Sequence, residues 1–218
     1  MNASPARCGA RLEHGEHGEH GELTVLARSQ WPALASPERP STEPARTEPP
    51  GIPGFIISSF SPLAAELAQR CLRQYFGDPP ADAERGGRTA IVLASTTGDI
   101  ATAAAIAGAV DQGRAVPPLL FYQSNPNAVA GHIAARWGLA GPVVCTIPAG
   151  AGPDALADAM DSAALLIEGG EADAALVVLA DQGGADGDRG AAVLVGSAAW
   201  PHQTARGEHA PAVRISDQ

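Results

Sequence analysis

A tight, glycine-rich turn is the stretch of this sequence best placed to carry chemistry. Residues 146–154 read TIPAGAGPD and follow an apolar run that predicts a strand. A strand that enters such a turn and then a helix aims one side chain and the helix's free N–H groups at one point, as in a nucleophile elbow. None of the turn side chains is a nucleophile, and glycine serves a tight turn whatever the ligand. The turn itself consists of Pro148, Ala149, Gly150, Ala151 and Gly152.

Cys145 is the nearest candidate nucleophile, but it lies inside the predicted strand, five residues before Gly150. The helix N-terminus cannot lower the pKa of a thiol placed there, so we expect a buried, inert cysteine. An acyltransferase that uses Cys145 remains the less favoured alternative. Cys8 and Cys71 are far away, no CxxC spacing occurs, and Cys71 falls on an apolar helical stripe typical of core packing.

Further candidate binding residues stand just before and within a predicted helix. Asn125 and Asn127 flank Pro126 at its start, and His132 lies inside it, beside Ile133. Because no second titratable group is close in sequence, we expect His132 to be structural or interfacial. Together with Gly150 and Gly152 of the turn, these residues form the candidate binding set.

The N-terminal residues 13–22 repeat a Glu-His-Gly unit. Their imidazoles and carboxylates could bind a divalent metal, but the glycines leave no preformed geometry. We therefore expect no metal site and a disordered tail over 1–22.

The elements that would position these residues alternate between strands and helices, which is the signature of an α/β fold. Pro-rich residues 32–53 predict a loop, and 201–218 predict a frayed tail, leaving one domain over 23–200. Ser61 and Asp154 are the expected N-caps of the first and last helices. The expected strands are 23–28, 89–95, 143–147, 174–180 and 191–195, the last two joined by a hairpin turn; the expected helices are 61–76, 100–110, 125–137 and 154–168; the apolar runs 54–60 and 116–122 are left without a type.

Composition limits the function classes. The 218 residues carry a net charge of −10 with a pI near 4.9, which argues against a nucleic-acid partner. Every basic residue is an arginine, so lysine-dependent chemistry is excluded. No apolar run approaches the roughly 20 residues of a membrane span. Reduced cysteines and the lack of a signal core predict a cytoplasmic protein. We expect no cofactor.

Three stretches resemble β-ketoacyl synthases in order and spacing. Residues 123–142 (QSNPNAVAGHIAARWGLAGP) are similar to the helix that ends in GLxGP and leads to the catalytic cysteine in that family. Residues 170–178 (GEADAALVV) resemble the GxADxxLV start of a strand, and 189–195 (RGAAVLV) resemble the GAxALVL hairpin. The resemblance covers about residues 54–196 and is strongest to chain-length-factor-like proteins. It implies the N-terminal half of a thiolase-like fold, with a mixed central sheet and helices on both faces.

The departures from this family bear on activity. Eight residues after Gly-Pro, where the family has its cysteine, this sequence has Gly150, and counting back from Asp173 reaches Pro153. The C-terminal half that would supply two histidines and a lysine is not part of this chain. The resemblance therefore implies a non-catalytic subunit of polyketide or fatty-acyl biosynthesis.

In the family, the strand before the cysteine pairs with its twin across a two-fold axis. The equivalent strand here would make the chain dimerise with an active ketosynthase or with itself. The expected interface residues are Val143, Val144, Cys145, Thr146 and Ile147. The alternative is a stand-alone module that binds acyl chains or acyl carrier protein through the N–H groups of the turn.

Overall fold

The computed structural model describes residues 23–32, 48–183, 187–197 and 200. The predicted tails, 1–22 and 201–218, and residues 33–47 of the Pro-rich loop lie outside the described residues. Residues 48–53, the described end of that loop, form neither helix nor strand. The elements are β1 (Thr24–Trp31), α1 (Phe60–Phe76), α2 (Ala83–Gly87), β2 (Thr89–Ala94), α3 (Ile100–Asp111), α4 (Pro118–Gln123), α5 (Pro126–Trp137), β3 (Val143–Thr146), α6 (Pro153–Glu168), β4 (Ala174–Asp181) and β5 (Arg189–Gly196).

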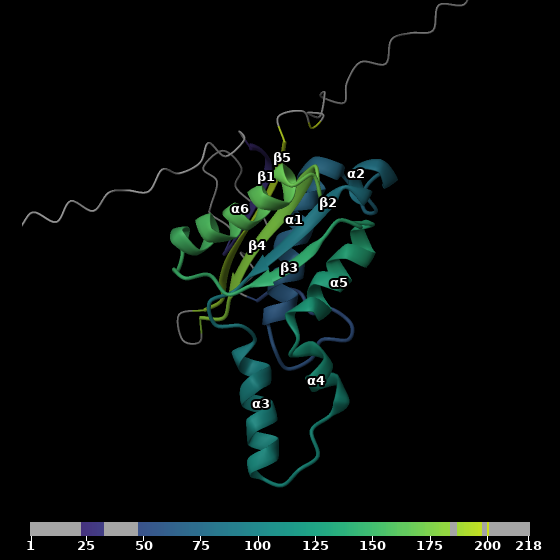
Figure 1. Ribbon diagram of the computed structural model, residues 1–218. Coiled ribbons are helices and arrows are strands. Elements are labelled where there is room, and N and C mark those ends of the chain that lie inside the picture. Colours follow the sequence, from purple (N-terminus) through teal and green to yellow (C-terminus); the bar gives the residue numbers. More distant parts are fainter. Residues whose placement is uncertain (1–22, 33–47, 184–186, 198–199, 201–218) are drawn as a thin grey trace, which may run out of the picture.

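Five strands form one mixed sheet in the order β1-β5-β4-β2-β3 (Figure 1). β2 pairs in parallel with β3 on one side and with β4 on the other, and β5 is antiparallel to β4 and β1. The predicted α/β fold with a mixed central sheet is confirmed. β3 is one edge strand of the described sheet, next to β2 alone, and β1 is the other.

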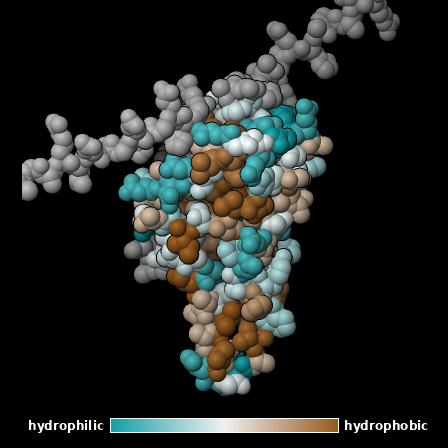
Figure 2. All heavy atoms as spheres, viewed as in Figure 1, coloured by the Kyte–Doolittle hydropathy of each residue, from teal (hydrophilic) through white to brown (hydrophobic). Residues whose placement is uncertain are grey.

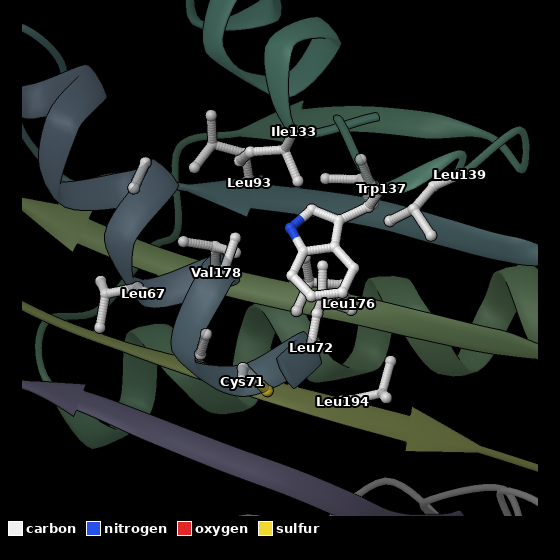
Figure 3. Packing of buried hydrophobic residues seen from close by; sticks show 14 of the residues in the cluster. Leu67, Cys71, Leu72, Leu93, Ile133, Trp137, Leu139, Leu176, Val178 and Leu194 are labelled. Atoms are coloured by element: carbon white, nitrogen blue, oxygen red, sulfur yellow. The ribbon is translucent and has the colours of Figure 1, made fainter. Parts of the chain in front are cut away.

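Side chains of the central strands alternate between two apolar layers, as a strand buried on both faces requires. Leu176 and Val178 of β4 pack with α1 and α5, whereas Val177 and Leu179 pack with α6. Helices therefore cover both faces. Figure 3 shows Trp137, only 1 % exposed, directed into the first layer beside Leu176.

Several element boundaries differ from those predicted. α1 begins at Phe60 after Ser59, not after Ser61, because buried Phe60 donates its N–H to Ser58 Oγ (3.1 Å). The N-cap of α6 is Gly152, not Asp154, and Pro153 fills the first helical position. The run 116–122 proves to be mostly α4, and α2 was not predicted from the sequence.

α3 and α4 stand away from the end of the sheet as a helical hairpin, here called the arm (residues 100–123; Figure 1). Only Thr102 and Ala109 of α3 are buried, although the helix carries no charge before Asp111. The arm thus leaves apolar surface exposed. No helix in the described part of the chain is long and apolar enough to cross a membrane.

Candidate functional site

The turn between β3 and α6 has the backbone of an elbow and no reactive side chain. Gly152 adopts φ 58° and ψ −125°, a conformation that residues with a Cβ rarely take. At Gly150 a Cβ would lie 2.7 Å from the Cβ of Asp154. A thiol at either position would therefore strain the turn.

A carboxylate of α6 already uses one of the N–H groups of this turn. Asp158 Oδ2 accepts a hydrogen bond from the backbone N–H of Ala149 at 3.0 Å. In a catalytic elbow, such N–H groups are left free for the negative charge that develops on a substrate oxygen. A fixed carboxylate here opposes that use of the turn.

Cys145 points away from the turn. Its side chain packs against the layer formed by α1 and α5, while α6 covers the other face of the sheet. The thiol donates to Asn127 Oδ1 (3.1 Å), and burial raises its pKa. The α6 N-terminus therefore lies on the wrong face to activate this thiol. Cys71 is in the core, as predicted, and burial raises the pKa of its thiol to about 12.

The other candidate binding residues make structural contacts. Asn125 caps α5 by accepting from the N–H of Asn127 at 3.0 Å. His132 is half-buried and meets the ring of Phe55 edge-on, with centroids 5.9 Å apart. Burial, followed by the nearby charge of Arg136, lowers the pKa of His132. The structure brings Cys145 and Asn127 together, and places His132 and the turn glycines at other points.

Two cavities flank the loop that follows β2, at the carboxyl ends of the parallel strands, where α/β proteins usually bind ligands. One, of about 610 Å³, lies between this loop, the α6 N-terminus and the β4–β5 hairpin; apolar lining comes from Trp31, Leu156 and Leu179. The other, of about 310 Å³, lies on the β3 side and includes Cys145 and Ile147 in its lining.

Hydrogen bonds to Asp181 hold the loop that follows β2, between the two cavities. This residue was not predicted from the sequence. Asp181, the last residue of β4, accepts from Ser95 Oγ at 2.9 Å and from the N–H of Thr96 at 2.7 Å. Its signal was its position directly after the predicted strand 174–180, because the ends of such strands gather at one edge of a parallel sheet. Within the described ranges, no group of three or more His, Cys, Asp and Glu side chains is arranged to hold a metal ion.

Apolar side chains are exposed at the sheet edge and on the arm. On the β3 side, Val143 is 43 % and Ile147 82 % exposed; on the arm, Val110 is 62 %, Phe121 77 % and Tyr122 56 % exposed. Figure 2 shows apolar surface on the arm below the sheet. The sequence predicted the first patch and missed the second, whose signal was a helix without a polar face.

Comparisons with known proteins agree with this architecture. Residues 57–184, more than half of the chain, match the family described as β-ketoacyl synthase, N-terminal domain. A search of curated proteins gives no significant match.

Among solved structures, a ketosynthase in complex with its chain length factor, from Xenorhabdus doucetiae, is similar at a TM-score of 0.58 and 20 % identity, covering 80 % of this chain and 79 % of that chain. The ishigamide ketosynthase/chain length factor has a TM-score of 0.55 at 20 % identity, covering 68 % and 46 %. A β-ketoacyl synthase from Burkholderia phymatum has 0.53 at 16 %, covering 63 % and 42 %.

The last two matched chains are thus less than half covered, whereas the first is close to this chain in length. At these identities the structures share the fold with this protein. The family match extends from the loop before α1 to the end of β4 and includes the turn, the edge strand and the arm. The chain therefore belongs to the β-ketoacyl synthase family and carries its N-terminal domain.

Proposed function

We propose that this protein is a non-catalytic, chain-length-factor-like subunit that pairs with an active ketosynthase in polyketide or fatty-acyl assembly. The observation that carries the proposal is the turn between β3 and α6, which keeps the backbone of an elbow while its tip holds Gly150 and Gly152. The complexes of ketosynthases with chain length factors named above have the same fold.

Two surfaces favour a partner. β3 pairs only with β2 in the described sheet, and an unpaired apolar edge favours association with another strand. α3 has apolar residues around its circumference and two buried residues, Thr102 and Ala109. Helices of this kind are normally buried within a protein interior or an interface. Both surfaces would be covered in a subunit that docks through the edge of its sheet and its arm.

Co-expression with the full-length ketosynthase encoded nearest to this gene tests the proposal. We expect a one-to-one complex by size exclusion with light scattering. Ile147→Asp and Phe121→Asp each place a charge on a proposed contact surface and should weaken the complex at least about tenfold. Leu165→Asp is the matched control, because Leu165 is 64 % exposed and lies on α6, a helix that is part of neither proposed surface.

Three outcomes would overturn the proposal. The first is a chain that stays monomeric beside the ketosynthase. The second is a control variant that weakens the complex as much as the two test variants. The third is a homodimer of this chain that excludes the ketosynthase.

A second candidate function, binding of acyl chains or of acyl carrier protein without a partner, is favoured by the cavity of about 610 Å³. Its lining by Trp31, Leu156 and Leu179 suits an apolar chain. Titration calorimetry with an acyl-pantetheine would then show binding to the isolated chain. Leu156→Trp should fill the cavity and abolish that heat, while Leu165→Trp should not; absence of heat with the unmodified chain rejects this candidate.

A further inference from the structure

The first helix of the arm, α3, is attached to the rest of the molecule by polar contacts rather than by an apolar core. In α4, Leu120 is buried and the ring of Tyr122 meets that of Phe55, with centroids 6.3 Å apart. The buried residues of α3 are Thr102 and Ala109, and the helix packs mainly on α4. Apolar contacts are not directional, so two small buried side chains would fix the position of a 12-residue helix poorly. The contacts at the root of the arm must account for its orientation.

Gln123, the last residue of α4, joins three segments at this root. It is 2 % exposed. Its Oε1 accepts from the N–H of Ile56 at 2.8 Å, and its Nε2 donates to the carbonyl of Ile56 at 2.6 Å and to Thr102 Oγ1 at 2.7 Å. The loop before α1, the end of α4 and the first turn of α3 are thereby held by one side chain.

Gln182, directly after β4, makes the corresponding contacts from the sheet. It is 9 % exposed, and its Oε1 accepts from the N–H of Ala101 at 3.1 Å. Its Nε2 donates to Ser59 Oγ at 3.0 Å and to Ser58 Oγ at 3.2 Å. Gln182 therefore satisfies a free N–H of α3 from the end of a central strand.

Asp99 completes the connection as the N-cap of α3. Its carboxylate accepts from the N–H of Thr102 at 2.9 Å, from Thr102 Oγ1 at 2.7 Å and from the hydroxyl of Ser58. Thr102 Oγ1 thus donates to Asp99 and accepts from Gln123. Buried hydrogen bonds of this kind are directional and costly to leave unmade, so together they define one orientation of the arm.

We propose that Gln123 and Gln182 are positioning residues, which hold the arm at a fixed angle to the sheet and so present its apolar surface to a partner already ordered. A preorganised surface loses less conformational entropy on binding than one that must order itself. Binding of a partner to this surface rests on the proposed function, whereas the fixed orientation of the arm is a property of the chain by itself.

Hydrogen exchange measured by mass spectrometry on the full chain tests the fixed orientation. Gln123→Leu keeps the approximate size of the side chain but removes its three hydrogen bonds, to the N–H and the carbonyl of Ile56 and to the hydroxyl of Thr102. We expect exchange of the arm amides (100–123) to accelerate at least about tenfold, with β4 amides unchanged. Gln182→Leu should act in the same direction.

Thr89→Val is the matched control, since Thr89 is fully buried and its Oγ1 donates to the carbonyl of Arg85 in α2 at 2.7 Å. Thr89 begins β2, whereas the arm follows the opposite end of that strand. This variant should leave the exchange of the arm unchanged. Unaltered protection of the arm in both glutamine variants would overturn the proposal. Equal acceleration in the arm and in β4 would also overturn it, because it would indicate a general loss of stability.

A second measurement separates this proposal from the proposed function. If the chain binds the co-expressed ketosynthase, Gln123→Leu should weaken that complex at least about tenfold and Thr89→Val should not. A loosened arm with unchanged affinity would overturn the role in presentation. A loosened arm in a chain that binds no ketosynthase would reject the proposed function and leave the fixed orientation supported.

Discussion

Asp158 accepts a hydrogen bond from the backbone N–H of Ala149, with 3.0 Å between Oδ2 and N. The carboxylate comes from the second turn of α6, and the N–H belongs to the turn that leads into the same helix. The contact ties the helix back onto its own entrance. It also occupies a donor that a catalytic elbow would keep for its substrate.

Asp158→Ala should destabilise the protein modestly, by about 0.5–1.5 kcal/mol, because one hydrogen bond of an exposed side chain is lost. Chemical denaturation checks this value. Asp161→Ala, an exposed carboxylate on the same helix, is the control and should change the free energy of unfolding less. Equal effects of the two substitutions would show that charge on α6, rather than the contact with Ala149, is responsible.

Gly152→Ala should destabilise the protein by about 1–3 kcal/mol, since φ 58° and ψ −125° are unfavourable for a residue with a Cβ. For Gly131→Ala we expect the opposite change in stability. Gly131 lies inside α5, where an added Cβ would meet nothing within 4 Å, so alanine should stabilise the helix by about 0.5–1 kcal/mol. Thermal unfolding of both variants checks the pair, and a neutral Gly152→Ala would contradict the strained turn.

The thiols of Cys145 and Cys71 should react slowly in a Cys8→Ser background. Burial raises both pKa values, so the thiolate fraction at a given pH is below that of a free cysteine. With a pKa of about 12, Cys71 has about one thiolate in ten thousand at pH 8 and should label only on unfolding.

Alkylation rates against pH check this, and for Cys145 the rate should still rise above pH 9. Intact mass after incubation with an acyl thioester should show no adduct. An acyl adduct that disappears in Cys145→Ala would instead support an acyltransferase.

Stability should depend on pH through Asp173. Arg88 donates to both carboxylate oxygens, at 3.0 and 2.8 Å, and this pairing lowers the pKa of Asp173. A lowered pKa in the folded state contributes stability above the usual pKa of aspartate and loses it as pH falls.

Asp173→Asn should therefore be slightly less stable than the unmodified chain at pH 7, and the two should converge below about pH 4. The difference should also shrink in 1 M salt, because the pair is exposed. A difference that persists at low pH would assign the effect to packing.

Local patterns were enough to predict the order and type of most elements. The β-branched and alanine-rich runs around Val92 and Val177 are apolar at every position, which indicates strands buried on both faces, and the structure buries both. The candidate turn, with its missing nucleophile, was also predicted, because a turn's composition is visible in nine consecutive residues. The N-caps at Ser61 and Asp154 were wrong, since buried Phe60 and the backbone of Gly152 decide where those helices begin.

The sequence by itself determined the family, the layered α/β plan and the absence of a reactive group in residues 147–152. Each of these is visible in patterns of residues that are close together along the chain. Only the tertiary structure decided that Cys145 faces α5, that Asp158 binds Ala149, and that Gln123 reaches Ile56. Gln123 and Ile56 are 67 residues apart, and no local periodicity reports a contact over such a separation. The pleat of β3 turns Cys145 toward Asn127 of α5, and the packing of α5 and α6 on opposite faces of the sheet keeps this thiol away from the α6 N-terminus.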